Sequence, residues 1–109
     1  MKEEREFFAT GELAWADAGN GIAERVLSHA PDGTLTRLAR WAPGTTSGEE
    51  IIRHDYVEEV YLLEGELTDL TLRQTFHPGD YACRPPGMPH GPYRTEAGCT
   101  MLEIRYLAR

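Results

Sequence analysis

The sequence has little cysteine and no long apolar run. Only two of its 109 residues are cysteine, Cys83 and Cys99, and their spacing is not that of a cysteine-rich metal site. We therefore expect two free thiols in a reducing compartment. No segment approaches the roughly 18 consecutive apolar residues of a membrane-spanning helix. The charged start, Met1 to Glu6, has no apolar signal core, so we expect a cytoplasmic protein that does not contact membranes.

Positive charge is also scarce. The chain has 11 Lys and Arg against 18 Asp and Glu, a formal net charge of −7, which argues against a nucleic-acid or anionic-membrane partner. A chain of 109 residues without repeats, low-complexity segments or linkers is one domain. We expect residues 1–10 to form a charged arm and residues 11–109 to form the domain. Phe7 and Phe8 of the arm are available to pack on the domain or on a partner subunit.

Short segments of alternating character, separated by glycine and proline turns, predict an all-β protein. Turn signals occur at Gly19-Asn20-Gly21, Pro31-Asp32-Gly33 and Pro43-Gly44. Turns at intervals of about 8–12 residues are typical of a sandwich or barrel, here of about nine short strands with little or no helix. The expected strands cover residues 13–18, 22–28, 34–41, 51–54, 59–63, 67–76, 81–84 and 100–107.

Two of these segments carry specific expectations. In residues 67–76 the alternation places Leu70, Leu72 and Phe76 on one strand face. Residues 50–63 also fit a helix, because their apolar side chains form one helical stripe and Ser47 followed by Glu50 resembles a capping box. We favour two strands joined by a bend, since the segment is rich in β-branched and aromatic residues and is followed by a glycine.

Three side chains, His54, Glu58 and His90, are candidates for holding one metal ion. Imidazole and carboxylate are ligands that divalent iron, zinc, manganese, nickel and cobalt accept, and two His with one carboxylate leave positions open for water, O2 or substrate. In an extended strand His54 and Glu58 would lie about 13 Å apart, so the chain has to bend at residues 55–57 for them to meet. Glu59 is the alternative to Glu58, because either could be the inward-facing residue.

These residues resemble the two motifs of the cupin family. His54, Glu58 and Gly65 have the intervals of the first motif, and the second motif is matched by Gly79, Pro85, Gly87 and His90. Two positions depart from the pattern: Ile52 stands where cupins have the first His of a His-x-His pair, and Arg94 where an Asn often closes the second motif.

The resemblance implies a jelly-roll β-barrel that holds one divalent metal ion inside. It transfers the ligand role to His54, Glu58 and His90, with three ligands in place of the usual four. Iron or zinc is the expected metal, and manganese, nickel or cobalt are alternatives. The motif spacing favours Glu58 over Glu59 as the carboxylate ligand.

Residues 12–107 are similar to one subgroup, the single-domain cupins related to acetylacetone dioxygenase and to the cupin domain of zinc-dependent anti-sigma factors. The similarity rests on the segments 58–69, 85–90 and 96–99. It implies a metal-dependent dioxygenase that acts on a small ketone or diketone. A non-catalytic cupin that binds or senses a small molecule or metal, and a sugar isomerase or epimerase, are the alternatives. Small cupins often pair through edge strands, so we expect a homodimer.

Other side chains could modify such a site. Tyr56 lies in the expected bend, where its hydroxyl could orient a substrate or its ring could simply pack. Glu103 would be a candidate base, its pKa raised by burial, only if its strand face lines the barrel. Glu50 could replace the missing ligand, although an exposed loop position is the simpler interpretation. His29 and His77 lie in turn-rich segments and are expected at the surface.

Overall fold

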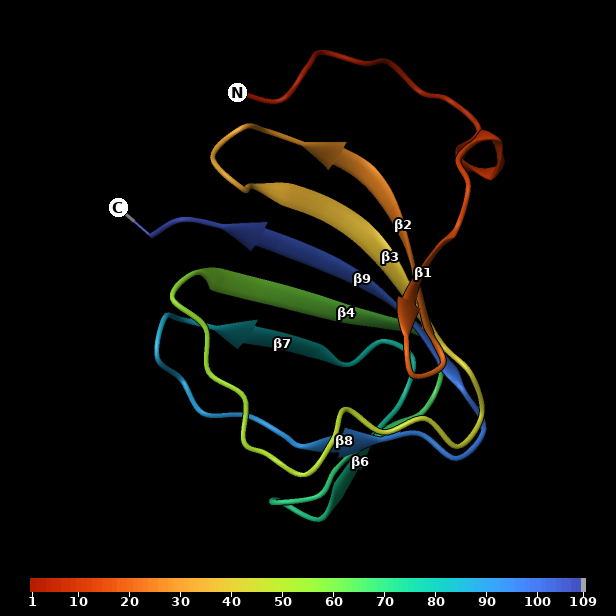
Figure 1. Cartoon of the computed structure of the whole chain (residues 1–109), viewed down its shortest axis with the longest axis vertical. Helices are drawn as coiled ribbons and strands as arrows, with labels where there is room; N and C mark the ends of the chain where they lie inside the picture. The colour runs from red at the N-terminus through yellow and green to blue at the C-terminus, as the bar shows by residue number, and fades with distance from the viewer. Residues whose placement is uncertain (109) are drawn as a thin grey trace.

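The computed structural model describes residues 1–108, and almost all of its regular structure is β-sheet. Nine strands form a six-stranded sheet in the order β1-β2-β3-β9-β4-β7 and a three-stranded sheet in the order β6-β5-β8 (Figure 1). This confirms the all-β jelly-roll barrel. The strands are β1 (Ala16–Gly19), β2 (Ile22–His29), β3 (Leu35–Trp41), β4 (Val57–Gly65), β5 (Leu67–Asp69), β6 (Gln74–Phe76), β7 (Tyr81–Arg84), β8 (Tyr93–Arg94) and β9 (Cys99–Tyr106).

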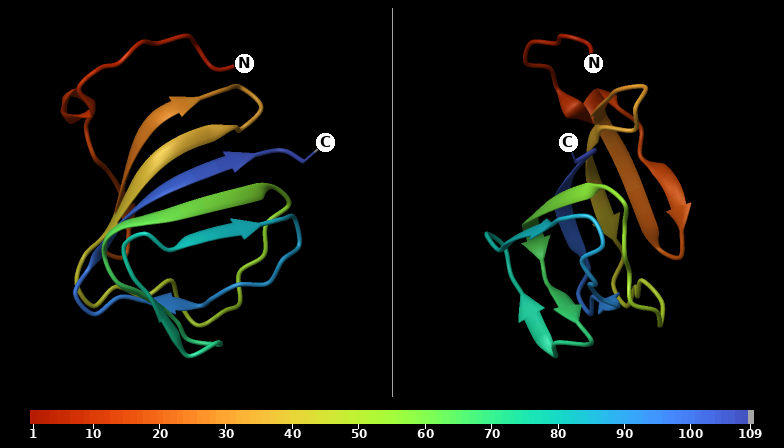
Figure 2. Two further views of the ribbon diagram at one scale, coloured as in Figure 1. Left: turned by 180° about the vertical axis from the view of Figure 1, so that it is seen from behind. Right: turned by 90° about the vertical axis from the view of Figure 1, so that its left-hand side faces the viewer.

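The two sheets lie as facing layers with the hydrophobic core between them (Figure 2). Alternation along the long strands produces this arrangement: Ala39 on β3, Met101 on β9 and Leu62 on β4 are directly paired, and all three are buried. From the smaller sheet, Leu67 and Tyr93 complete the same core. The inner surface of the larger sheet therefore supplies one wall of the barrel.

The segment 67–76 is not the single strand that its alternation predicts. It forms the hairpin of β5 and β6, because residues 70–73 turn back. The Asp69 carboxylate accepts hydrogen bonds from the backbone N–H groups of Thr71 and Leu72 at 2.9 and 3.0 Å, and this local side-chain cap outweighs strand propensity. As a result Leu70 and Leu72 are exposed in the turn and do not share a strand face with Phe76.

Residues 50–63 bend as favoured above and do not form a helix. The expected strand 51–54 is reduced to one bridge, in which the backbones of Ile52 and His90 exchange hydrogen bonds of 2.8 and 3.0 Å. The chain then bends at residues 55 and 56, and β4 begins at Val57. The two-residue strand β8 was not predicted, because a run this short between Pro92 and Thr95 carries no periodic signal.

The first nine residues have no regular structure and are followed by the single 3-10 turn Thr10–Glu12. Lys2 Nζ donates to Thr36 Oγ1 on β3 at 2.8 Å, whereas the Phe7 side chain is fully exposed. The boundary at residue 10 between arm and domain stays a prediction. In residues 1–108 no helix is long and apolar enough to cross a membrane. Cys83 and Cys99 are both free, as expected.

Candidate metal centre

His54, Glu58 and His90 come from three different parts of the fold and meet on the inner side of the larger sheet. His54 lies just before the bend that leads into β4, Glu58 is the second residue of β4, and His90 lies in the loop between β7 and β8. Each offers one ligand atom, and these atoms lie within 4.8 Å of one another. His54 Nε2 is 3.9 Å from Glu58 Oε1, and the two imidazole rings are 5.1 Å apart between centroids. The spacing is compatible with a shared ion.

The register of β4 decides between the two neighbouring glutamates. Glu58 and Val60 are buried on the core side, and Glu59 and Tyr61 point to the other side of the sheet. Glu59 accepts a short hydrogen bond from the Tyr81 hydroxyl there. Glu58 is therefore the carboxylate that belongs to the cluster, and Glu59 is not.

His90 provides the test of whether a metal fits. Its Nε2 is buried and has no hydrogen-bond partner within residues 1–108, whereas its Nδ1 lies 3.0 Å from the Tyr93 hydroxyl. If Nδ1–H donates to the Tyr93 oxygen, the lone pair of Nε2 faces the cluster without a partner, which is the tautomer that ligates a metal. Burial, with the positive charge of Arg84, lowers the pKa of His90 to about 4. The neutral imidazole that a metal requires is thus already present, and the residues fit a bound ion.

Arg84 holds this cluster together and was missed by sequence reasoning. Its Nη1 donates to Glu58 Oε1 at 2.5 Å, and its Nη2 donates to the Tyr93 hydroxyl at 2.7 Å. One guanidinium therefore contacts the candidate carboxylate ligand directly and the candidate His90 through Tyr93. The only sequence signal is its position: Arg84 ends β7 and pairs directly with Glu58 on β4, so both side chains point to the same side.

The position of the missing fourth ligand is apolar. Ile52 lines the same cavity as the cluster and packs against the core. Glu50 is exposed and lies outside the cluster, so it does not replace that ligand. His29 and His77 are exposed, as expected.

The cluster opens on a cavity of about 160 Å³ that also contains the two further candidate residues. The Tyr56 ring stacks on His54 at 4.5 Å between centroids, and the Arg105 guanidinium lies 4.7 Å from the Tyr56 ring centroid. Burial raises the pKa of Tyr56. The Tyr56 ring is thus packed between two neighbours at the cavity wall.

The face of β9 that carries Met101 and Glu103 lines this cavity. Glu103 accepts a hydrogen bond from Arg37 Nε at 2.7 Å, and Arg37 also pairs with Glu24 at 2.9 Å. Burial raises the pKa of Glu103, and the Arg37 charge partly offsets this by favouring the ionised form. Glu103 therefore lies on a strand face that lines the cavity, as a candidate base has to, and its carboxylate already pairs with Arg37.

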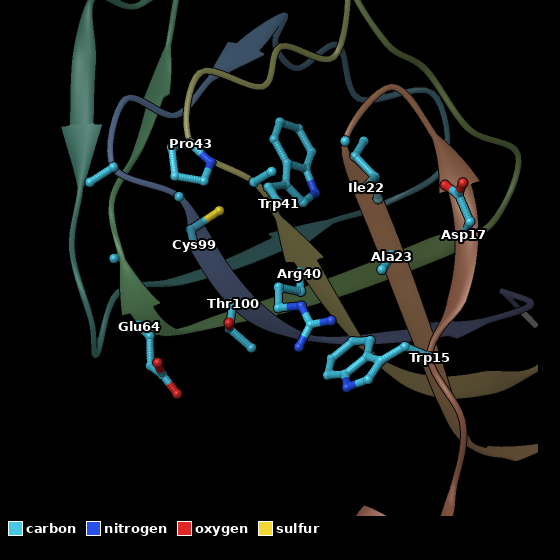
Figure 3. A pocket seen from close by; sticks show the side chains of 15 residues that line it. Trp15, Asp17, Ile22, Ala23, Arg40, Trp41, Pro43, Glu64, Cys99 and Thr100 are labelled. Atoms are coloured by element: carbon cyan, nitrogen blue, oxygen red, sulfur yellow. The ribbon is translucent and has the colours of Figure 1, made fainter.

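A larger open hollow, about 650 Å³, lies at the other side of the larger sheet and contains none of the three cluster residues. Figure 3 shows Glu64, Thr100, Arg40 and Trp15 following one another along it. The candidate metal-binding side chains line the smaller inner cavity, and the larger hollow is a separate feature of the outer surface.

The sequence profile of the ChrR cupin-like domain matches residues 3–105. An RmlC-like cupin from Shewanella frigidimarina has the same fold, with a TM-score of 0.79 at 19% identity over 99% of this chain and 95% of that one. An acetylacetone dioxygenase from Acinetobacter johnsonii gives a TM-score of 0.71 at 16% identity, over 96% of this chain and 74% of that one. The structure of Rhodobacter sphaeroides SigE in complex with the anti-sigma ChrR gives a TM-score of 0.69 at 21% identity, over 87% of this chain and 50% of the matched chain. No curated protein matches the sequence.

Proposed function

Given that this chain belongs to the ChrR cupin-like domain family, we propose that it binds one divalent metal ion through His54, Glu58 and His90 and is a dioxygenase of a small ketone or diketone. The observation that carries the proposal is the buried His90 Nε2, which has no hydrogen-bond partner in the described part of the chain and lies near two further ligand atoms beside a cavity. A buried polar atom without a partner is costly, and a metal ion would satisfy it. Iron or zinc is the expected ion.

The cavity limits the substrate to a small molecule. Its volume of about 160 Å³ is below the roughly 300–1,000 Å³ of sites for drug-sized ligands, so a compact molecule such as a short diketone fits and a sugar nucleotide does not. A bound divalent ion would supply Lewis acidity for a substrate oxygen and, as iron, redox chemistry with O2. The likeness to an acetylacetone dioxygenase supports this substrate class.

The chain's own residues have separate roles in this proposal. Tyr56 forms the cavity wall beside His54, from which its hydroxyl would orient the substrate. Glu103 would accept a proton from the substrate, and its pairing with Arg37 holds the carboxylate in place. Arg84 and Tyr93 orient two ligands through their hydrogen bonds. We further expect the protein to act in the cytoplasm as a homodimer.

A non-catalytic sensing or binding domain is the second candidate, and one observation favours it. The Glu58 carboxylate already forms an ion pair with Arg84, and Ile52 supplies no ligand. The site would therefore hold an ion less tightly than a site with four ligands. Reversible binding suits a sensor more than an enzyme. The likeness to ChrR in its complex with SigE supports this alternative.

Elemental analysis of protein purified without added metal tests the proposal. We expect about one iron or zinc per chain, and its loss in both His54→Ala and His90→Ala, because each variant leaves two ligands. His29→Ala is the matched control, since His29 is exposed and outside the cluster. O2 uptake with a panel of diketones then separates the candidates: uptake that needs both histidines supports the dioxygenase, and bound metal without uptake supports the sensor. A chain that binds no metal even when iron or zinc is supplied would disprove the dioxygenase and the metal sensor, and would leave only a small-molecule binding domain.

A further inference from the structure

The outer face of the six-stranded sheet, the side turned away from the core, has a regular pattern that the metal site does not explain. Directly paired residues of an antiparallel sheet point to the same side, so pairing sorts this face into rows that run across the strands. The first row contains Ala23, Arg40, Thr100 and Glu64. The second contains Arg25, Leu38, Leu102, Tyr61 and Tyr81. The third contains Thr36, Ile104, Glu59 and Cys83.

The middle of this outer face is apolar and its two sides differ in charge. Leu102 and Ile104 lie on β9, with Tyr61 and Tyr81 beside them 44% and 58% exposed. Large aromatic rings at this exposure, adjoining a continuous apolar strip, are typical of a protein interface.

The two sides are opposite in charge. On the β3 side Arg40 carries a positive charge, and on the β4 side Glu64 carries a negative one; within residues 1–108 neither has an ion-pair partner. Trp15 packs against the Arg25 and Arg40 guanidiniums, which lie 4.5 and 4.2 Å from its ring centroid, and Figure 3 shows it beside Arg40. On the β4 and β7 side Tyr61 and Tyr81 are exposed.

We propose that the outer face binds a second copy of this chain, with a two-fold axis running along β9. Strand β9 is the middle one of β2, β3, β9, β4 and β7, so this rotation sets β3 against β4 of the second copy and β2 against its β7. A closed dimer needs such a self-complementary patch. The occupant is a copy of the same chain because each half of the face matches the other half.

Each row finds a complementary partner in this arrangement. In the first row, Arg40 meets Glu64 of the second copy. In the second row, Leu38 meets Tyr61 of the second copy, and the Trp15 ring that packs on Arg25 meets its Tyr81, an aromatic pair. Leu102 and Ile104 lie at the axis and contact their own equivalents.

The other face-to-face rotation, about an axis perpendicular to the strands, does not fit. It sets each strand against itself and exchanges the first and third rows, so that Glu64 meets Glu59 of the second copy. Like charges placed together oppose association. The five strands and three rows span roughly 20 by 20 Å at the usual strand spacing and residue rise, which is about half of the roughly 800 Å² per partner of a standard interface.

Charge reversal tests this interface by sedimentation or light scattering. We expect the natural chain to have twice the 12.3 kDa mass of one chain. Arg40→Glu and Glu64→Arg should each raise the dimer dissociation constant at least about tenfold, because each places like charges together. The double variant restores the pair in the opposite sense and should return most of the affinity. This rescue is the result that a merely unfolded variant cannot give.

Arg73→Glu is the matched control, since Arg73 is an exposed cation in the β5–β6 turn, away from the outer face. It should leave the dimer unchanged, and circular dichroism checks that all variants are folded. A monomer at tens of micromolar natural protein would overturn the proposal. A dimer that both single reversals leave intact would overturn it too and would indicate pairing through the sheet edges. None of these outcomes depends on whether the inner cavity binds a metal.

Discussion

The Tyr93 hydroxyl offers the sharpest test of how the candidate metal site is held together. Tyr93 is 5% exposed, and its ring is part of the core. Its hydroxyl accepts a hydrogen bond from Arg84 Nη2 at 2.7 Å and lies 3.0 Å from His90 Nδ1. Tyr93→Phe keeps the ring and removes only this oxygen. We expect the variant to fold, and to lose the contact that fixes the tautomer and ring orientation of His90.

The expected size of the effect follows from those two contacts. Removing a group that orients a ligating His typically weakens metal binding by about 10- to 100-fold, which is about 1.4–2.8 kcal/mol. The metal-free protein should also lose stability, by about 1–3 kcal/mol, because the Arg84 Nη2 donor loses its buried acceptor. The affinity loss and the stability loss therefore have separate causes, and both can be measured.

Zinc affinity, measured by competition with a chromophoric chelator, and urea unfolding of the metal-free protein check the two numbers. Tyr61→Phe is the matched control, because it removes a tyrosine hydroxyl from the exposed outer side of β4. We expect it to leave the zinc affinity unchanged. Zinc binding by Tyr93→Phe within a factor of two of the natural chain would refute the idea that this hydroxyl sets the His90 ligand.

Two further substitutions test two positions of the first motif: Ile52, where this chain departs from the motif, and Gly65, where it matches the motif. Ile52→His should tighten zinc binding by about tenfold or more in the same chelator assay, because Ile52 lines the cavity of the cluster and a third imidazole, the fourth ligand, would be added there. Gly65→Ala should lower the unfolding free energy by more than about 4 kcal/mol, since a Cβ would lie 1.9 Å from the Gly98 carbonyl oxygen at a φ of +78°. Gly33→Ala, at a φ of +93° with nothing within 4 Å, should cost only about 1–2 kcal/mol by urea unfolding, and equal losses would contradict the clash.

The fold was predictable where the sequence alternates over many residues. Strands β2 and β3 begin and end within about one residue of the expected ranges, because seven or eight alternating positions average out local exceptions. The hairpin at 67–76 was not predictable from alternation, since a single Asp69 side chain decides it by capping two backbone N–H groups. A propensity summed along a segment does not contain that information.

The candidate site divides in the same way. The intervals within the two motifs indicate His54, Glu58 and His90, and the structure brings their ligand atoms together. Arg84 and Tyr93 could not be predicted, because they reach the cluster through pairing between strands. The hydrophobic periodicity of the chain does not indicate that the last residue of β7 pairs with the second residue of β4.

That pairing makes the site depend on register as much as on ligand identity. Glu58 and Arg84 are opposite each other on β4 and β7, and a slip of one residue along β4 would place Glu59 on the inner side in place of Glu58. The same slip would bury Tyr61 and expose Leu62. The loss of Leu62 from the hydrophobic core makes the slipped register unfavourable. Burial of Val60 and Leu62 therefore selects Glu58 as the inward carboxylate, and the hydrophobic pattern of a single strand fixes which glutamate can reach a metal.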